Sequence, residues 1–412
     1  MRNRHPELLI PASSLEVLKT AVMFGADAVY IGGEAFGLRA KAKNFSMEDM
    51  KEGVQFAHEH GARVHVTVNI LAHNDDLEGA AEYLKELKEI GPDALIIADP
   101  AIFMLAKEIC PEIERHVSTQ ANNTNYGTFN FWWNLGAKRV VTARELSLKE
   151  IREIRAHIPA EMEIESFIHG AMCISYSGRC LLSNFFTGRD ANQGACTHPC
   201  RWKYSVVEET RPGEYMPVYE NERGTYIFNS KDLCMIEHIP EMIDAGIDSF
   251  KIEGRMKTAL YVATVARTYR KAIDDYLEDP KKYEANMPWY RDQISNCTYR
   301  QFTTGFYFGK PGDESQIYDS NTYIKEYTYL GIIGGIKDGM YRIEQRNKFS
   351  VGETIEIMKP DGQNVEVTVE KIIDEDGQEQ ESAPHPKQVL YVALSGEASV
   401  YDILRRQEGV TE

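Results

Sequence analysis

The sequence predicts an α/β fold in which a (β/α)8 TIM-barrel-like N-terminal domain is followed by a small C-terminal β-barrel domain. Short apolar runs alternate with amphipathic helical stretches from the first residues onward, and this alternation is typical of a parallel sheet covered by helices. Eight such runs precede residue 275, which favours a closed barrel over an open sheet. From about Tyr327 onward, short strand patterns separated by turn residues predict a separate all-β domain.

Each expected barrel strand is a short apolar run flanked by turn residues. The eight segments are residues 7–10, 28–31, 63–68, 94–97, 116–119, 139–142, 163–168 and 249–253. Amphipathic helices place apolar side chains three and four positions apart. The segments between strands that show this spacing are residues 14–24, 47–60, 77–90 and 146–157. Glycines such as Gly91 stand where a helix must stop and the chain must turn back into a strand.

A long interval from His169 to Ile247 interrupts the regular alternation. It is too long for a single crossover connection and contains five of the seven cysteines, so we expect a cysteine-rich insertion at about residues 170–247 on the catalytic face of the barrel. The predicted domains are a barrel over residues 1–275, a helical or irregular connector over 276–326, and a small β-barrel over 327–412. The strand patterns of this last domain cover residues 329–336, 340–345, 353–359, 365–373 and 388–395.

Composition places the chain among globular proteins, because 43% of its 412 residues are hydrophobic and can fill two cores. No stretch reaches about 18 uninterrupted apolar residues, and the N-terminus has too short an apolar run for a secretory signal. We therefore expect a cytoplasmic protein without a membrane partner, whose seven cysteines serve as thiols and metal ligands rather than as a disulfide framework. The net charge of −17 argues against nonspecific nucleic-acid binding, although basic residues concentrate between Arg179 and Arg270.

The cysteines of the insertion have an irregular spacing. They are Cys173, Cys180, Cys196, Cys200 and Cys234. A structural zinc site would normally show two short-spaced pairs, and a radical-SAM triad would need a cysteine where Lys203 stands. Thiolates at irregular spacing suit an iron–sulfur cluster, because the fold can bring distant ligands together. A zinc site and buried thiols without a metal are the alternatives.

Polar residues at the expected C-terminal ends of the strands are candidate functional groups, because the active site of a (β/α)8 barrel lies at that face. His169 and Glu253 are the candidate catalytic residues, and an imidazole can transfer a proton near neutral pH. The candidate substrate-binding residues at this face are Arg39, Asn122, Arg144 and Arg255. The alternative is that these side chains satisfy backbone groups or pair with Glu34, Glu145 or Glu253 inside the barrel mouth.

Three segments carry a resemblance to a known family. They are ESFIHGAMCISYSGRCLLS at 165–183, NQGACTHPCRWKY at 192–204 and NSKDLCMIEHIPEMIDAGIDSFKIEGRMK at 229–257. In these segments and over nearly its whole length, the chain resembles the peptidase U32 family of collagenase-like peptidases. It contains neither the G-x-S-x-G nor the H-E-x-x-H motif of hydrolases. Known family members instead hydroxylate a tRNA wobble uridine, a ribosomal RNA cytidine or a ubiquinone precursor without oxygen, and a single barrel with one β domain is most similar to the tRNA branch.

The resemblance implies hydroxylation of the wobble uridine to 5-hydroxyuridine, with prephenate as the hydroxyl donor. It also implies an iron–sulfur cluster, expected as 4Fe–4S, with Cys200 as the alternative to Cys234 among its ligands. The expected ligands are Cys173, Cys180, Cys196 and Cys234. The alternative functions are a collagenase-like peptidase, a hydroxylase of ribosomal RNA or of a quinone precursor, and a metal-binding module without catalysis.

The resemblance also indicates which side chains meet the substrates. Prephenate carries two carboxylates, which planar arginine side chains bind bidentately, so we expect Arg39, Arg144 and Arg255 to bind it. A tRNA anticodon loop offers an unstacked base, for which Tyr176 is the candidate stacking residue. Hydrophobic packing around the metal is the alternative role of Tyr176. The expected partners are prephenate, tRNA through its anticodon loop, and a homologous or accessory protein subunit.

Overall fold

The computed structural model describes residues 5–33, 45–172, 176, 180–189, 191, 196–201, 205–206, 216–217, 229–297, 301–311, 316–317 and 326–408. The chain forms two compact units. The first comprises Met1–Val22, Ala26–Lys257 and Arg300–Thr322, and the second comprises Met23–Gly25, Thr258–Tyr299 and Tyr323–Glu412. The domain bounds expected from the sequence, 1–275, 276–326 and 327–412, stay a prediction.

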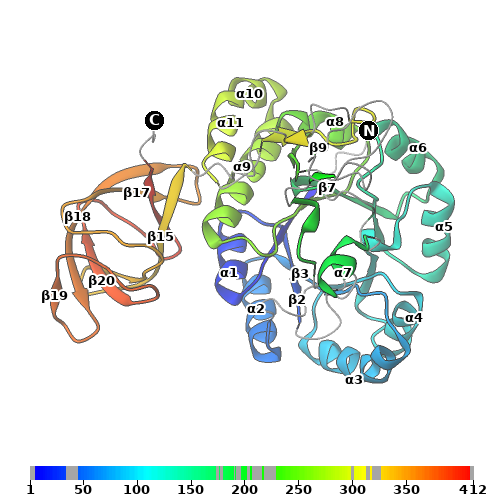
Figure 1. The fold of residues 1–412 in the computed structure, drawn as a ribbon, viewed down its shortest axis with the longest axis horizontal. Coiled ribbons are helices and arrows are strands. Elements are labelled where there is room, and N and C mark those ends of the chain that lie inside the picture. Colours follow the sequence, from blue (N-terminus) through cyan, green and yellow to red (C-terminus); the bar gives the residue numbers. More distant parts are fainter. Residues whose placement is uncertain are drawn as a thin grey trace. The chain divides into compact units, whose positions relative to one another are not determined.

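In the first unit, eight strands form a closed parallel barrel, which confirms the predicted TIM-barrel-like fold (Figure 1). They are β1 (Glu7–Pro11), β2 (Ala28–Gly32), β3 (Arg63–Val68), β4 (Ala94–Ile97), β5 (Glu114–Val117), β6 (Arg139–Val141), β7 (Glu163–Ala171) and β12 (Ser249–Ile252). Neighbouring strands pair in chain order, and β12 closes the ring by pairing with both β1 and β7. Seven of the eight begin at the predicted residue, whereas β5 begins two residues earlier than expected, at Glu114.

Helices surround this ring of strands in Figure 1. They are α1 (Leu15–Met23), α2 (Met47–Glu59), α3 (Asn74–Ile90), α4 (Pro100–Ile109), α5 (Tyr126–Leu135) and α6 (Leu148–His157). Local side chains set their ends: the Ser46 hydroxyl accepts from the backbone N–H of Asp49, and Ser147 forms a reciprocal capping box with Glu150. Gly91 ends α3 in the left-handed conformation, with φ of 74°. Among the described helices, none combines the length and apolar character needed to cross a membrane.

The cysteine-rich segment between β7 and β12 is built from short elements. They are α7 (Leu182–Thr187), η2 (Pro199–Arg201), β8 (Ser205–Val206), β9 (Met216–Pro217), β10 (Asn229–Ser230), β11 (Asp232–Cys234), η3 (Ile236–His238) and α8 (Ile239–Asp244). Strand β11 runs antiparallel to the end of β7 and places Cys234 opposite His169. Two later strands, β13 (Phe302–Thr303) and β14 (Gln316–Ile317), pair with β11 and β10. The segment is therefore attached to the C-terminal end of a barrel strand.

The second unit contains three helices and a closed antiparallel barrel within its described residues, which confirms the predicted small β-barrel. The helices are α9 (Ala259–Glu278), α10 (Pro280–Ala285) and α11 (Met287–Ser295). The strands are β15 (Tyr327–Lys337), β16 (Met340–Glu344), β17 (Thr354–Met358), β18 (Asn364–Asp374), β19 (Glu379–Gln380), β20 (Val389–Leu394) and β21 (Ile403–Gln407). Their order is β17-β21-β15-β16-β20-β18-β19, and pairing of β17 with β18 closes the ring around a core that includes Leu330, Ile343 and Ile357. Strands β19 and β21 were not predicted.

Candidate active site

The barrel interior holds a buried network of charged side chains. Arg139 of β6 lies at its centre, with its side chain 2% exposed. Its Nε and Nη2 donate to Glu163 Oε2 at 2.9 and 2.7 Å, its Nη1 donates to Glu165 Oε2 at 3.1 Å, and both terminal nitrogens contact the Glu7 carboxylate. Burial alone would raise the pKa of Glu7, but the charge of Arg139 and its hydrogen bonds hold that pKa well below its ordinary value. One arginine thus connects β6 to the carboxylates of β1 and β7.

Lys251 of β12 connects this network to two aromatic rings. Its Nζ donates to Glu165 Oε1 at 2.7 Å and lies 4.5 Å from the ring centroid of Tyr30 and 5.4 Å from that of Phe167. Arg144, which follows β6, has its Cζ 3.9 Å from the same Phe167 centroid. Each contact of this kind contributes about 0.5–2 kcal/mol, depending on desolvation. The Phe167 ring therefore fixes the positions of two cations.

Arg144 and Glu253, both predicted as site residues, form an ion pair. Arg144 Nη2 lies 3.5 Å from Glu253 Oε2, and Arg144 Nη1 donates to the backbone oxygen of Ala171 at 2.6 Å. The Tyr30 hydroxyl lies 3.5 Å from the same Glu253 oxygen. Glu253, rather than Glu145, is therefore the partner of Arg144. Because their side chains remain 14% and 17% exposed, both can still meet a bound ligand.

Arg255, a third predicted site residue, is almost fully buried where the chain leaves β12. Its Nη1 donates to the Thr67 hydroxyl of β3 at 2.9 Å. A β-carbon at Gly32 of β2 would lie only 2.5 Å from that nitrogen, so the missing side chain makes room for the guanidinium. Arg255 thus reaches from β12 to the ends of β2 and β3, at the face where TIM-barrel active sites lie.

His169 is buried near the end of β7, with 1% of its surface exposed. Burial lowers the pKa of His169 to about 4, with Asp232 opposing the shift and Lys257 adding to it. The imidazole is therefore neutral at pH 7 and offers a proton acceptor rather than an imidazolium donor. A catalytic role for His169 remains a prediction, and the same holds for Glu253.

Unpaired polar atoms follow β5 and β6. Asn122 ends the short helix η1 (Thr119–Ala121) in the left-handed conformation, and its Nδ2 donates to the backbone oxygen of Gln120 at 2.7 Å. Among the described residues, Asn122 Oδ1, both amide atoms of the fully buried Gln120 and the Nε of Arg144 have no hydrogen-bond partner. Leaving such an atom unpaired costs about 1–3 kcal/mol. A polar ligand bound here would satisfy these atoms.

Hydrogen bonds hold two of the cysteine-bearing segments together. Ser183 lies three residues after Cys180, and its buried hydroxyl accepts from the backbone N–H of Thr197 at 3.0 Å. The same hydroxyl is hydrogen-bonded to the Thr197 hydroxyl at 3.1 Å. Cys196 immediately precedes Thr197, and its Sγ accepts from the backbone N–H of His198 at 3.4 Å. A backbone N–H directed at sulfur stabilises a thiolate, which is the form that ligates metals.

Two further cysteines of this region, Cys200 and Cys234, lie on described elements. Cys200 lies in η2, which contacts β10, and Cys234 lies opposite His169. Cys180, Cys196, Cys200 and Cys234 are all partly buried thiols. These donors fit an iron–sulfur cluster, because four thiolates from distant chain positions are what such a cluster requires. Cys173 lies outside the described residues, so the choice of four ligands stays a prediction.

Two predicted substrate-binding residues remain, Tyr176 and Arg39. Tyr176 is 44% exposed, and exposed apolar side chains continue at Leu181 and at Phe185 of α7, which is 81% exposed. Arg39 lies outside the described residues. The structure therefore brings together Arg144, Glu253 and the ring that holds Arg144, and it presents aromatic side chains on the surface beside the cysteine segments.

Several residues of this site were not predicted. Tyr30, Thr67 and Phe167 each lie at strand positions that face the interior, and their contacts with Lys251, Arg255 and Arg144 depend on how the strands are aligned. Arg139 had a signal in the sequence, because a charged residue inside a buried apolar run requires a buried partner.

The comparisons with known proteins cover nearly the whole chain. The model of "Peptidase family U32" matches residues 13–317, and that of "Peptidase family U32 C-terminal domain" matches residues 325–405. The chain is 43% identical to "tRNA hydroxylation protein P1" of Bacillus subtilis (strain 168), over 98% of this chain and 95% of that protein. It is 39% identical to "tRNA hydroxylation protein P" of Escherichia coli (strain K12), over 92% and 91%. It is 41% identical to a 23S rRNA 5-hydroxycytidine synthase of Escherichia coli, over 66% of this chain and 40% of that protein.

Proposed function

Because this chain belongs to peptidase family U32, we propose that it hydroxylates a tRNA, converting the wobble uridine to 5-hydroxyuridine. The end-to-end similarity to two tRNA hydroxylation proteins, at 43% and 39% identity, carries this proposal. The C5–H bond of the uracil breaks and a C5–O bond forms, which removes two electrons from the base. A donor whose C–OH bond becomes a C–H bond accepts the same two electrons, so the transfer needs no molecular oxygen.

Prephenate is the proposed donor, and the barrel mouth has the groups to bind it. Its two carboxylates require cationic, bidentate partners, for which Arg144 and Arg255 are available. The unpaired amide atoms of Gln120 and Asn122 provide further donors and acceptors for its polar groups. The buried Phe167 and Tyr30 rings keep Arg144 and Lys251 in place and exclude water.

An iron–sulfur cluster, proposed as 4Fe–4S, would be held by Cys173, Cys180, Cys196 and either Cys234 or Cys200. When bound, it supplies one-electron transfer or a Lewis-acidic iron at the end of β7. The protein residues beside it have separate tasks. His169 can hold a proton near Cys234, since its neutral imidazole is an acceptor, and Arg144 orients the donor.

The proposed tRNA contact lies on the exposed aromatic side chains near the cysteine segments. Phe185 is mostly exposed and Tyr176 half-exposed, which is costly unless such side chains meet a partner. Unstacked bases of an anticodon loop stack on rings of this kind, at about 1–3 kcal/mol per base. The net charge of −17 means that this contact depends on local basic residues.

Nucleoside mass spectrometry of tRNA tests the proposal. Purified protein, prepared without oxygen and incubated with prephenate and tRNA from a deletion strain, should restore 5-hydroxyuridine. The Cys180→Ser variant should lose iron, sulfide and activity, whereas Cys110→Ser should keep all three, because Cys110 is a buried thiol bonded to the Ala106 backbone. Unchanged tRNA nucleosides on deletion would overturn the assignment. Activity that requires cell extract would identify the expected homologous or accessory subunit.

Hydroxylation of a ribosomal RNA cytidine is the second candidate, because the chain is 41% identical to a 5-hydroxycytidine synthase. That similarity covers only 40% of the synthase, whereas the similarity to the tRNA proteins covers over nine-tenths of each. The tRNA assignment is therefore favoured. Nucleosides from ribosomal RNA of the same strains, analysed in parallel, separate the two candidates, and peptide hydrolysis by the purified protein would favour the peptidase alternative.

A further inference from the structure

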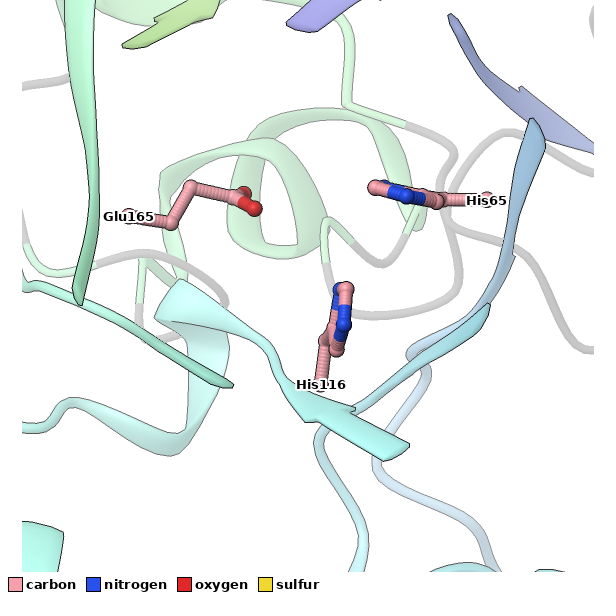
Figure 2. A group of neighbouring side chains, drawn as sticks. All are labelled: His65, His116 and Glu165. Atoms are coloured by element: carbon pink, nitrogen blue, oxygen red, sulfur yellow. The ribbon is translucent and has the colours of Figure 1, made fainter. Parts of the chain in front are cut away.

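Three side chains converge inside the barrel, away from the cysteine segments. His65 of β3, His116 of β5 and Glu165 of β7 point toward one another (Figure 2). All three are completely buried, and their ligand atoms lie within 4.8 Å of one another. Strands β3, β5 and β7 alternate around the ring, and alternate strands fill a single layer of a (β/α)8 barrel.

The two imidazoles make fewer hydrogen bonds than buried polar groups normally do, although His116 Nε2 lies 3.2 Å from Glu114 Oε2. Neither ring nitrogen of His65 has a partner among the described residues, and neither does Nδ1 of His116. The rings contact each other edge to face, with centroids 4.8 Å apart. Three unpaired nitrogens at about 1–3 kcal/mol each would be a large cost, which a bound group could remove.

The donor atoms of this group favour a cation. In the surrounding interior, Arg139 and Lys251 contact three carboxylates, and Arg63 and Lys138 lie 3.7 and 3.6 Å from two of them. A neutral imidazole offers one lone pair to a metal, and Glu165 offers a carboxylate oxygen. An anion in this position would lie against the Glu165 carboxylate.

Glu165 is already oriented for a ligand role. Its Oε1 accepts from Lys251 and its Oε2 from Arg139, at 2.7 and 3.1 Å. A carboxylate has about four lone-pair positions, so both bonds leave room for a metal. Hydrogen bonds of this kind to a ligating carboxylate are typical of metal sites, where they fix its orientation.

We propose that His65, His116 and Glu165 bind a divalent transition-metal ion, Zn²⁺ or Fe²⁺, at a site separate from the cysteine cluster. Two imidazole nitrogens and one carboxylate oxygen form a donor set that these ions prefer. Ligand atoms about 2.1 Å from a tetrahedral metal are about 3.4 Å apart, so the three side chains close by roughly 1 Å on binding. His65 is two residues before Thr67, the partner of Arg255, so the ion lies one layer beneath the proposed substrate arginine.

Zinc retention tests the proposal on the full-length protein. The protein is incubated with Zn²⁺ alone, freed of excess ion and analysed for metal. Wild type and His58→Gln, a control histidine on the surface of α2 that pairs with Asp93, should each retain about one zinc in this site. His65→Gln should retain about one zinc fewer per chain, because any zinc bound by the cysteines stays in both proteins. Equal retention in wild type and His65→Gln would overturn the proposal.

X-ray absorption at the metal edge gives a second measurement that needs no variant. Nitrogen and oxygen neighbours at about 2.0–2.1 Å with imidazole scattering would support the site, and iron with the same neighbours would assign it to Fe²⁺. A shell of sulfur alone at about 2.3 Å would place the metal on the cysteines and overturn the proposal. Loss of tRNA hydroxylation in Cys180→Ser would not change the nitrogen and oxygen neighbours of this metal. The metal-site proposal and the proposed hydroxylase function can therefore fail independently.

Discussion

Replacing Arg139 with methionine should destabilise the barrel by about 3–5 kcal/mol at pH 7. Methionine keeps most of the length of the side chain and removes its charge. Glu7 and Glu163 then lose their buried cation, while Glu165 keeps Lys251. The cost arises because the remaining cations, Arg63 at 3.7 Å from Glu7 and Lys138 at 3.6 Å from Glu163, are each 36% exposed and replace the buried charge only in part.

The pH dependence bounds this magnitude. A buried carboxylate that has lost its partner can avoid its charge by binding a proton. Protonation above an ordinary pKa of about 4.3 costs about 1.4 kcal/mol per pH unit, which is about 4 kcal/mol at pH 7 and about 1 kcal/mol at pH 5. In the wild type, the pKa of Glu7 is held well below that value, so Glu7 contributes stability above the unfolded pKa that is lost as the pH falls. The variant lacks this contribution, and its deficit should therefore shrink toward pH 5.

Urea denaturation followed by tryptophan fluorescence measures the effect, because the buried Trp132 of α5 reports on the barrel. Lys85→Met on α3 is the matched control. Its ion pair with Glu82 is exposed, so losing it should cost less than about 1 kcal/mol. A deficit below about 1 kcal/mol for Arg139→Met at pH 7, or one of equal size at pH 5 and pH 7, would refute the reasoning.

Other contacts of the site give further expected outcomes. Arg144→Lys should raise KM for prephenate about 10–100-fold in 5-hydroxyuridine formation, because lysine cannot bind a carboxylate bidentately; an unchanged KM would contradict this role. His169→Asn should reduce the loss of stability as the pH falls from 6.5 to about 4, because over this range the unfolded wild type binds a proton that the buried imidazole does not. Urea midpoints that change equally with pH in both proteins would contradict this explanation. Ser183→Ala should lower iron and sulfide per chain at least twofold, because it releases Thr197 beside Cys196. Unchanged iron content would show that cluster assembly does not depend on this hydrogen bond.

Much of the fold could be predicted because its signals are local. Barrel strands are short apolar runs, and residues such as Gly91 and Ser147 mark helix ends within a few positions. Strand β21 was missed because Arg405 and Arg406 interrupt its apolar run. Arg405 is nonetheless buried, since its Nη2 and Nε contact Glu356 of the neighbouring strand β17, and a partner 49 residues away leaves no local signal.

The candidate site was predicted only at the level of single residues. Arg144 and Glu253 could be placed at strand ends, but their pairing required the closure of β12 onto β7. His65, His116 and Glu165 carried no signal as a group, because they are about 50 residues apart and meet only through strand alignment. Local patterns therefore identify which residues face the barrel interior, whereas the order and alignment of the strands around the ring determine which of these residues are in contact.

Strand β7 shows how the interior, the mouth and the cysteine region depend on one another. Three alternate residues of this strand each lie in one of these regions. Glu165 binds the buried cations, the Phe167 ring packs against Arg144 and Lys251, and His169 lies opposite Cys234. Lys251 bonds the first of these residues and packs on the second. A change at Glu165 would therefore remove the carboxylate that binds Lys251 beside the Phe167 ring, on which Arg144 also packs, so the charge network of the interior borders the mouth through this one ring.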